Sequence, residues 1–347
     1  MNSKDIARIA GVSRSTVSRV INNYPNVPDE TREKVLKVIN EYNYVPHASA
    51  RTLAGYKNRI IGLFIIDIVE KEFGIKNKIT KSPYYLNFTS SVIGAASEKG
   101  YKVLVHIINN AERYDEIMEC FYNKTISGGI FIGHSDEDSV INKLIEEKYK
   151  IALIDRDLRL YKDCKCIIVN SDNFNGAYNA TKYLIELNHK KIAHITGDMN
   201  KFSSIERLRG YKKALEDFNI DVNDNMIVNS KFIEKCGYES TKKLFSRKIK
   251  PTAIFASNDK IAIGALNAIE ELGLKVPEDI SIIGFDDIEE SKYLNPPLST
   301  VKMELTEMAE IATNTLIRSI ENDIYISAYY DVPVSLEIRQ SCKKIIK

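Results

Sequence analysis

The sequence predicts an α/β protein with a small helical domain at its N-terminus and a larger body of two doubly wound parallel-sheet lobes. Within the first 45 residues, apolar side chains recur at helical spacing. From Arg59 onward, near-continuous apolar runs, which are typical of buried parallel strands, alternate with amphipathic helical segments. A chain of 347 residues is long enough for two or three domains. We therefore expect domains at residues 1–45 and 59–342, joined by a linker at residues 46–58.

The segment from Lys4 to Asn22 has the pattern of a helix-turn-helix. Gly11 is expected in the turn, because a tight turn between helices needs a residue that tolerates a positive φ. Ser13 is expected to cap the second helix, which would bury its aliphatic residues and expose a polar face. Such a face can hydrogen-bond to base edges and phosphates. We therefore expect DNA contacts from Ser13, Arg14, Ser15, Thr16, Ser18, Arg19 and Asn22.

A third helix is expected to follow Asp29, which would be its N-cap. It should end before Pro46, because the residue before a proline avoids the helical region. Its apolar residues would close a three-helix core, and they are Val35, Val38, Ile39 and Tyr42.

The body is expected to contain strands at residues 60–66, 103–105, 129–132, 151–154, 192–195, 253–255 and 280–283. Helices are expected at residues 88–99, 140–149, 176–188, 204–218, 260–272 and 305–320. No GxGxxG follows the first strand and no GxxxxGK[ST] occurs, which weakens the case for a nucleotide cofactor or phosphoryl transfer.

The charge of the chain is unevenly distributed. Residues 1–59 hold ten basic and five acidic side chains, whereas the remainder holds 39 and 42. A basic module on a mildly acidic body suits a polyanion partner at one end of the chain.

The first residues lack the apolar run of a secretory signal, and no run is long enough to span a membrane, so a cytoplasmic location is expected. The five cysteines are scattered without metal-ligand spacing, so we expect reduced thiols, no metal and no cofactor.

Four stretches of the chain resemble the lactose/galactose-repressor family of bacterial transcriptional regulators. They are Gly11–Asn22, Pro46–Leu53, Ile283–Asp287 and Pro296–Thr300. The resemblance implies a periplasmic-binding-protein-like body, a palindromic operator in double-stranded DNA, and a homodimer that reads two half-sites. The residues after Gln340 are too few for a tetramerising heptad helix, which also favours a dimer.

The linker contains small residues and one bulky apolar side chain, Leu53. In the family, this segment becomes helical on DNA and its leucine wedges into the minor groove, so the resemblance makes Leu53 a DNA contact. His47 stands where the family usually has asparagine. Because histidine is a weaker helix cap, the linker would order less readily here.

Ligands of open α/β sheets bind beyond the carboxyl ends of the strands, where this chain has aspartates, an asparagine and arginines. Such groups suit a neutral polyol. The resemblance places Arg207, Asn258 and Asp286 at the family's effector contacts, and Arg207 is preferred to Arg209 because it precedes Gly210 by three residues. The expected effector-binding residues are Tyr84, Asp155, Arg156, Arg207, Asn258, Phe285 and Asp286. Asp172 and Asn258 could each instead be helix caps.

A charged insertion at residues 70–81 departs from the short loop usual in the family, and Ser82 and Pro83 are expected to begin the helix after it.

We interpret the chain as a repressor whose operator affinity changes when a small molecule, most simply a sugar, binds between the lobes. A nucleobase or nucleoside effector and a protein co-repressor are alternatives. A sugar receptor would not need the N-terminal module. An enzyme is not expected, because the histidines form no catalytic constellation.

Overall fold

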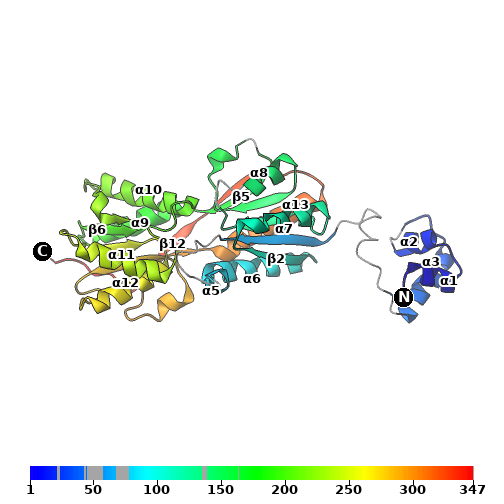
Figure 1. Ribbon diagram of the computed structural model, residues 1–347, viewed down its shortest axis with the longest axis horizontal. Coiled ribbons are helices and arrows are strands. Elements are labelled where there is room, and N and C mark those ends of the chain that lie inside the picture. Colours follow the sequence, from blue (N-terminus) through cyan, green and yellow to red (C-terminus); the bar gives the residue numbers. More distant parts are fainter. Residues whose placement is uncertain are drawn as a thin grey trace.

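The protein, seen in a computed structural model, consists of an N-terminal helical domain and a body of two α/β lobes (Figure 1). The structure describes residues 1–21, 24–42, 44, 58–67, 78–134, 139–162 and 164–346. Several expectations therefore lie outside the described residues. They are the DNA contacts of Asn22 and Leu53, nearly all of the linker at 46–58 with His47, and most of the charged insertion at 70–81.

Three helices form the N-terminal domain: α1 (Ser3–Ala10), α2 (Arg14–Ile21) and α3 (Asp29–Glu41). Gly11 ends α1 with a φ of 65°, as the turn requires, and Ser13 caps α2 by accepting a hydrogen bond from the Thr16 amide at 3.0 Å. The helices enclose an aliphatic core whose buried residues are Ile6, Ala7, Val17, Val20, Val27, Val35, Val38 and Tyr44.

Two details of α3 differ from expectation. Asp29 is the first helical residue, while Pro28 occupies the cap position and makes no side-chain cap bond. Tyr42 was expected in the core but is 48% exposed, and it lies just beyond the end of the helix at Glu41. Tyr44, two residues later, packs into the core instead.

The N-terminal lobe is a six-stranded parallel sheet with the order β11-β5-β4-β3-β1-β2. Successive residues of its central strand face different cores: Leu63 packs with α6 and α13, and Phe64 packs with α7 and α8. The strands are β1 (Ile60–Ile66), β2 (Lys102–Ile108), β3 (Gly129–Ile132), β4 (Ile151–Ile154), β5 (Ile167–Ser171) and β11 (Ala328–Val332). The helices are α5 (Lys78–Lys81), α6 (Pro83–Glu98), α7 (Tyr114–Tyr122), α8 (Ser139–Glu146) and α13 (Leu305–Glu321), with 3-10 turns at Ala111–Arg113 and Leu158–Leu160.

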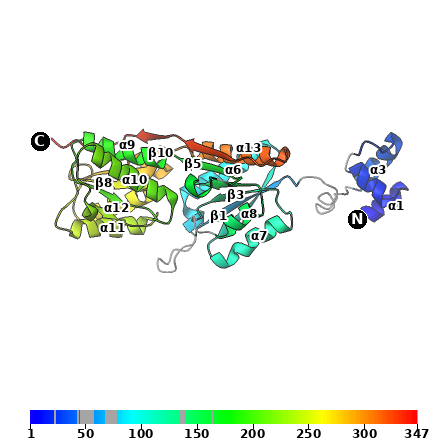
Figure 2. The ribbon, with the colours of Figure 1, turned by 90° about the horizontal axis from the view of Figure 1, so that it is seen from above.

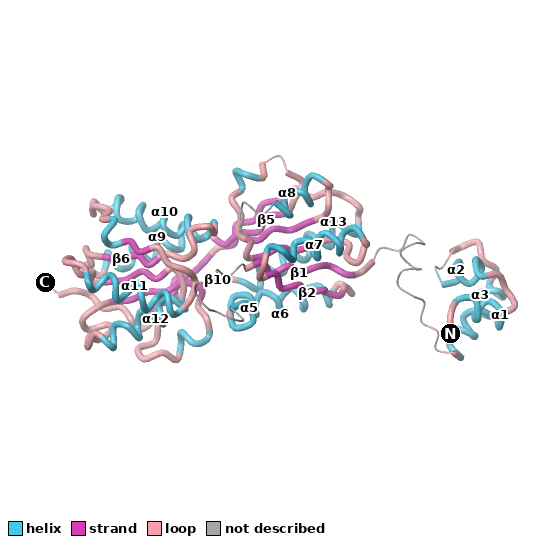
Figure 3. The backbone as a smooth tube through the Cα atoms, in the orientation of Figure 1, coloured by secondary structure: helices cyan, strands magenta, loops and turns pink. Residues whose placement is uncertain are grey.

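The C-terminal lobe has the strand order β12-β10-β9-β8-β6-β7, and only its β10–β12 pair is antiparallel among the described pairs. Helices α9 and α10 cover one face of this sheet, and α11 and α12 cover the other (Figure 3). The strands are β6 (Ile192–Ile195), β7 (Ile227–Val228), β8 (Ala253–Ala256), β9 (Ser281–Asp286), β10 (Ser299–Met303) and β12 (Val334–Glu337). The helices are α9 (Asn173–Glu186), α10 (Phe202–Asp217), α11 (Glu234–Ser246) and α12 (Asp259–Glu271), with 3-10 turns at Asp224–Met226 and Glu289–Lys292.

Within the described residues, the chain passes between the lobes at three places: from β5 to α9, from β10 to α13, and from β11 to β12. The last strands of the chain run along both lobes (Figure 2). No helix in the described part of the chain has the length and apolar character needed to cross a membrane. The two lobes are therefore joined by short crossings that lie together near the carboxyl ends of the parallel strands.

Candidate functional site

A cavity of about 330 Å³ lies between the lobes, beyond the carboxyl ends of their strands. The N-terminal lobe contributes Asp67 after β1 and Asp155 after β4. The C-terminal lobe contributes Arg207 from α10, Asn258 from the start of α12, and Asp286 from the end of β9. The structure thus brings five of the seven expected effector residues to one cavity, the fifth being Tyr84 of α6.

Arg207 is the central cation of this cavity and is only 3% exposed. Its Nε donates to Asn173 Oδ1 at 2.8 Å and its Nη1 donates to the Ser257 carbonyl. Its guanidinium also lies above the Phe285 ring. Burial lowers the pKa of Arg207, and the neighbouring carboxylates, Asp286 first among them, oppose that shift. The guanidinium is therefore held in a fixed orientation before any ligand arrives.

Asp286 lies 3.6 Å from Arg207, measured from Oδ1 to Nη1. Burial raises the pKa of Asp286 to about 6, although Arg207 and a hydrogen bond with Asn258 favour the carboxylate. Asn258 also caps α12, because its Oδ1 accepts from the Ile261 amide at 2.9 Å. Asn258 can therefore cap α12 and line the cavity at the same time. Asp172 caps α9 through the Asn175 amide at 3.0 Å, as expected.

Asn173 joins the two sides of the cavity. Its Nδ2 donates to Asp155 Oδ1 at 3.0 Å, while its Oδ1 accepts from Arg207. Asp155 has a φ of 63°, a conformation that few residues other than glycine adopt. Because Asn173 lies at the crossing from β5 to α9, this chain of contacts links the lobes through the site.

Arg156 and Phe285 lie behind the cavity wall and do not line it. Arg156 is buried and donates to the carbonyl of His134, while its backbone amide donates to Asn170 Oδ1 at 2.8 Å. Phe285 is fully buried beneath the guanidinium of Arg207. Both residues are placed to support neighbours that line the cavity.

The two tyrosines at the start of α6 have different environments. Tyr84 lines the cavity, where burial and the charges of Asp155 and Asp286 raise its pKa, so its hydroxyl stays neutral. Tyr85 donates its hydroxyl to Asp67 Oδ2 at 3.1 Å, and its ring meets that of Tyr84 edge to face with centroids 5.3 Å apart. Pro83 is the first helical residue, and Ser82 holds the cap position without a side-chain cap bond.

Several lining residues were missed by the sequence analysis. His134 follows β3, and burial lowers its pKa well below the usual value, so the ring is neutral. Lys201 precedes α10 and donates across the cleft to the carbonyl of Gly133. Phe232 presents a ring to the same space. Of these three residues only His134 carried a usable signal, because it follows a predicted strand at the carboxyl end where ligands bind; Asp67, after the first predicted strand, carried the same signal.

The face of α2 opposite the core is polar and accessible. Ser13, Arg14, Ser15, Ser18 and Arg19 are exposed, and Thr16 is half-buried. Arg14 Nε donates to Ser3 Oγ at 3.0 Å, which fixes its side chain against α1.

Comparison with known proteins decides the family. Residues 3–47 match the family of bacterial regulatory proteins called the lacI family, and residues 181–342 match the periplasmic binding protein-like domain. The chain is 33% identical to the HTH-type transcriptional repressor PurR of Haemophilus influenzae (strain PittEE) over 348 aligned residues, which cover 99% of each protein. The chain belongs to the LacI family.

Other LacI-family proteins match along nearly the whole chain. The ribose operon repressor of Haemophilus influenzae (strain ATCC 51907 / DSM 11121 / KW20 / Rd) is 35% identical over 320 residues, or 92% of each protein. The crystal structure of the lac repressor dimer bound to operator and the anti-inducer ONPF superposes with a TM-score of 0.79, at 26% identity and 98% coverage of both chains. The expected fold is confirmed. The chain is a LacI-family transcriptional repressor with a DNA-binding helix-turn-helix and an effector-binding domain, and its relatives are repressors rather than enzymes.

Proposed function

We propose that this repressor senses a small neutral carbohydrate, which binds in the cavity between the lobes and changes the affinity of the dimer for a palindromic operator. The observation that carries the proposal is the convergence of Arg207, Asp286, Asn258 and Asp155 on one enclosed space. Guanidinium, amide and carboxylate groups supply the mixture of donors and acceptors that vicinal hydroxyls require. At about 330 Å³, the cavity is near the lower end of the roughly 300–1,000 Å³ of ligand pockets, which favours a small ligand.

The charges around the cavity favour a neutral ligand. Among the lining residues that the structure describes, acidic and basic side chains are nearly balanced, so a phosphate or a carboxylic acid would gain little net attraction from them. His134 adds no charge, because burial lowers its pKa. The acidic lining residues are Asp67, Asp155, Asp198, Glu234 and Asp286, and the basic ones are Lys81, Lys201, Arg207 and Lys260.

A nucleobase is the second candidate effector. Tyr84 and Phe232 line the cavity and could stack on a planar ring as well as on the C–H face of a sugar. Among the relatives, the ribose operon repressor is named for a sugar, whereas the name of the repressor PurR states no ligand. A sugar presents hydroxyl groups to the cavity, whereas a nucleobase presents ring nitrogens and carbonyl or amino groups. Measuring which of the two binds therefore separates the candidates.

For the DNA side we propose that the exposed face of α2 reads the major groove of each half-site, through Ser13, Arg14, Ser15, Thr16, Ser18, Arg19 and Asn22. Leu53 is proposed to contact the minor groove, and residues 1–45, 46–58 and 59–342 are proposed as the domain limits. Effector binding would reorient the lobes, and operator affinity would follow from differential binding of the effector to the two arrangements.

The experiment that tests this function has two steps. Operator sequences are first selected from random DNA by the purified protein. Calorimetry and operator-binding assays then use D-ribose, D-glucose, maltose, cellobiose, adenine, guanine and adenosine. Binding of one sugar together with a changed operator affinity supports the proposal, whereas binding of a base alone supports the second candidate. If no small molecule binds, a protein co-repressor becomes the better explanation.

A further inference from the structure

The turn at the end of β9 has an unusual backbone. Asp286 has a φ of 114° and Asp287 has a φ of 57°. Consecutive residues other than glycine rarely adopt positive φ values, and such conformations persist where the surrounding contacts hold them. Because Asp286 lines the cavity, the groups that hold this turn determine where its carboxylate points.

Asp259, the first residue of α12, holds the turn from one side. Its fully buried carboxylate accepts hydrogen bonds from the Ile288 amide at 2.9 Å, Ser291 Oγ at 2.7 Å and Thr300 Oγ1 at 2.6 Å. All three donors are neutral. A Cβ atom at Gly284 would collide with this carboxylate, so the glycine in β9 makes room for it. Asp259 therefore joins α12, β10 and the segment that follows Asp286.

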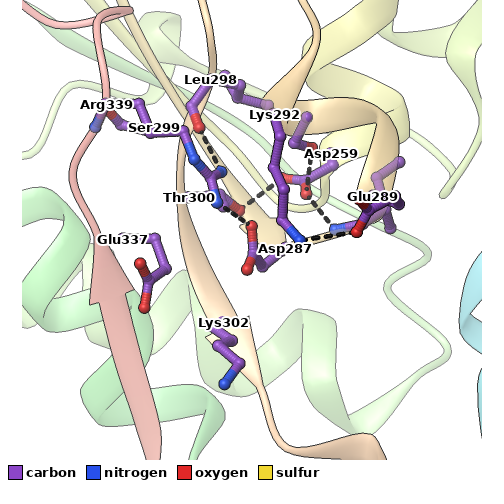
Figure 4. Close-up of polar contacts among 12 residues, drawn as sticks. Asp259, Asp287, Glu289, Lys292, Leu298, Ser299, Thr300, Lys302, Glu337 and Arg339 are labelled. Atoms are coloured by element: carbon purple, nitrogen blue, oxygen red, sulfur yellow. Dashed lines mark hydrogen bonds and ion pairs between the residues drawn. The ribbon is translucent and has the colours of Figure 1, made fainter.

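Arg339, which follows β12, holds the turn from another side (Figure 4). Its Nη2 contacts Asp287 Oδ1 at 2.6 Å, and its Nη1 donates to the Leu298 carbonyl at 2.8 Å. Its backbone amide donates to Ser299 Oγ at 2.9 Å. β12 follows the third crossing between the lobes. Arg339 therefore connects the turn at Asp286 and Asp287 to the chain segment that has just crossed from one lobe to the other.

We propose that Asp259 and Arg339 are positioning residues of the effector site: together they fix the turn from Asp286 to Ile288 and so aim the Asp286 carboxylate into the cavity. The inference deepens the proposed function and rests on it for the ligand measurements. The position and ionisation of Asp286 can, however, be measured without any ligand.

The charges around Asp286 provide a signature that a loss of packing alone would not produce. Arg207 of α10 lowers the pKa of Asp286 and Asp155 after β4 raises it, while Asp286 itself raises the pKa values of Tyr84 of α6 and Asp259 of α12. Arg207 and a hydrogen bond with Asn258 favour the Asp286 carboxylate only while the turn holds it against them. Loss of the turn should therefore change the pKa of Asp286.

The test compares Asp259→Ala and Arg339→Gln with Ser341→Ala in the full chain. Ser341 is a matched control because it is fully buried beside the same sheet, donates to the Ile282 carbonyl at 2.6 Å and accepts from the Ser299 amide at 2.8 Å. Carbon-13 NMR titration of aspartate carboxyls, assigned with Asp286→Asn, measures the pKa of Asp286 in the absence of ligand. Calorimetry with D-ribose and with adenine measures affinity.

We expect Asp259→Ala and Arg339→Gln to weaken the affinity of whichever probe binds by about 5- to 150-fold, the loss typical of a broken buried hydrogen bond. Ser341→Ala should leave that affinity within about twofold and the titration of Asp286 unchanged, whereas Asp259→Ala and Arg339→Gln should both move that titration from its wild-type position. Unchanged affinity in Asp259→Ala and Arg339→Gln, or an unchanged titration of Asp286 in both variants, overturns the proposal. If neither probe binds the wild type, the proposed function has failed for those ligands, and the NMR titration still decides the role of Asp259.

Discussion

The guanidinium of Arg207 lies over the ring of Phe285, with Cζ 3.6 Å from the ring centroid. Both side chains are buried, so the contact is shielded from water and stronger than a similar contact at the surface. The Phe285 ring reaches Gly176 of α9 and carries the guanidinium of Arg207 on its face, whereas the next residue, Asp286, lines the cavity. One strand end thus supplies both the support and the counter-charge of the same cation.

Phe285→Leu should weaken effector binding by about 2 kcal/mol, because Arg207 loses the ring that orients it. Affinity is measured by calorimetry with the ligand that the panel identifies. Phe255→Leu is the matched control, since Phe255 is a fully buried phenylalanine of β8 in the same lobe that does not support Arg207. Equal losses of affinity in the two variants would show that general packing, rather than the contact with Arg207, is responsible.

Arg207→Ala should abolish the effect of the ligand on operator binding at ordinary metabolite concentrations, since it leaves Asp286 and Asn173 without their partner. Basal operator affinity should persist because the DNA-reading face lies in another domain. Arg209→Ala is the control: Arg209 belongs to the same helix but is exposed and paired with Glu206. Circular dichroism must first show that both variants are folded. An unchanged response in folded Arg207→Ala would place the effector site elsewhere.

Arg19→Ala should reduce operator affinity by about 1–3 kcal/mol and relax selectivity at one or two base pairs, since Arg19 lies on the exposed face of α2. Lys37→Ala removes an equal charge from the exposed side of α3 and should leave base selectivity intact. Both variants are compared by selection from random DNA. The same base preferences in Arg19→Ala and the wild type would mean that another element reads the operator.

The stability of the body should depend on pH through Asp259. Burial and the charge of Asp286 raise the pKa of Asp259 to about 7, from 3.8 in the unfolded chain. Because the folded-state pKa is the higher one, the contribution of Asp259 to stability is fully present below about pH 4 and is lost as the pH rises through 7. The free energy of unfolding of Asp259→Asn, measured relative to wild type by urea denaturation, should therefore increase between pH 4 and 7. A difference that stays constant over that range would argue against a buried ionisable Asp259.

Several strands were predictable because buried parallel strands read as apolar runs, and β1, β3, β4 and β6 were found at the expected residues. β5 was not predicted, although it begins with three apolar residues. The strand β10 was missed, because it contains buried polar residues such as Thr300, whose hydroxyl is satisfied by Asp259. The pairing of β11 and β12 with different sheets was equally hidden, since it depends on a crossing that no local pattern encodes.

The candidate site was partly predictable for a similar reason. The rule that ligands bind at the carboxyl ends of strands pointed to Asp155, Asn258 and Asp286, all of which line the cavity. It could not separate them from their neighbours Arg156 and Phe285, because it identifies the end of a strand but not the direction of each side chain there. The contributions of residues distant in sequence, such as Lys201, depend on how the lobes meet.

The three crossings mean that neither lobe is a continuous piece of the chain. The N-terminal lobe needs α13 and β11, which come after almost all of the C-terminal lobe in the sequence. During synthesis from the N-terminus, the helix-turn-helix can fold early, whereas the first sheet must wait for residues 305–332. A nascent repressor therefore carries a finished DNA-reading module before the part of the molecule that regulates it exists.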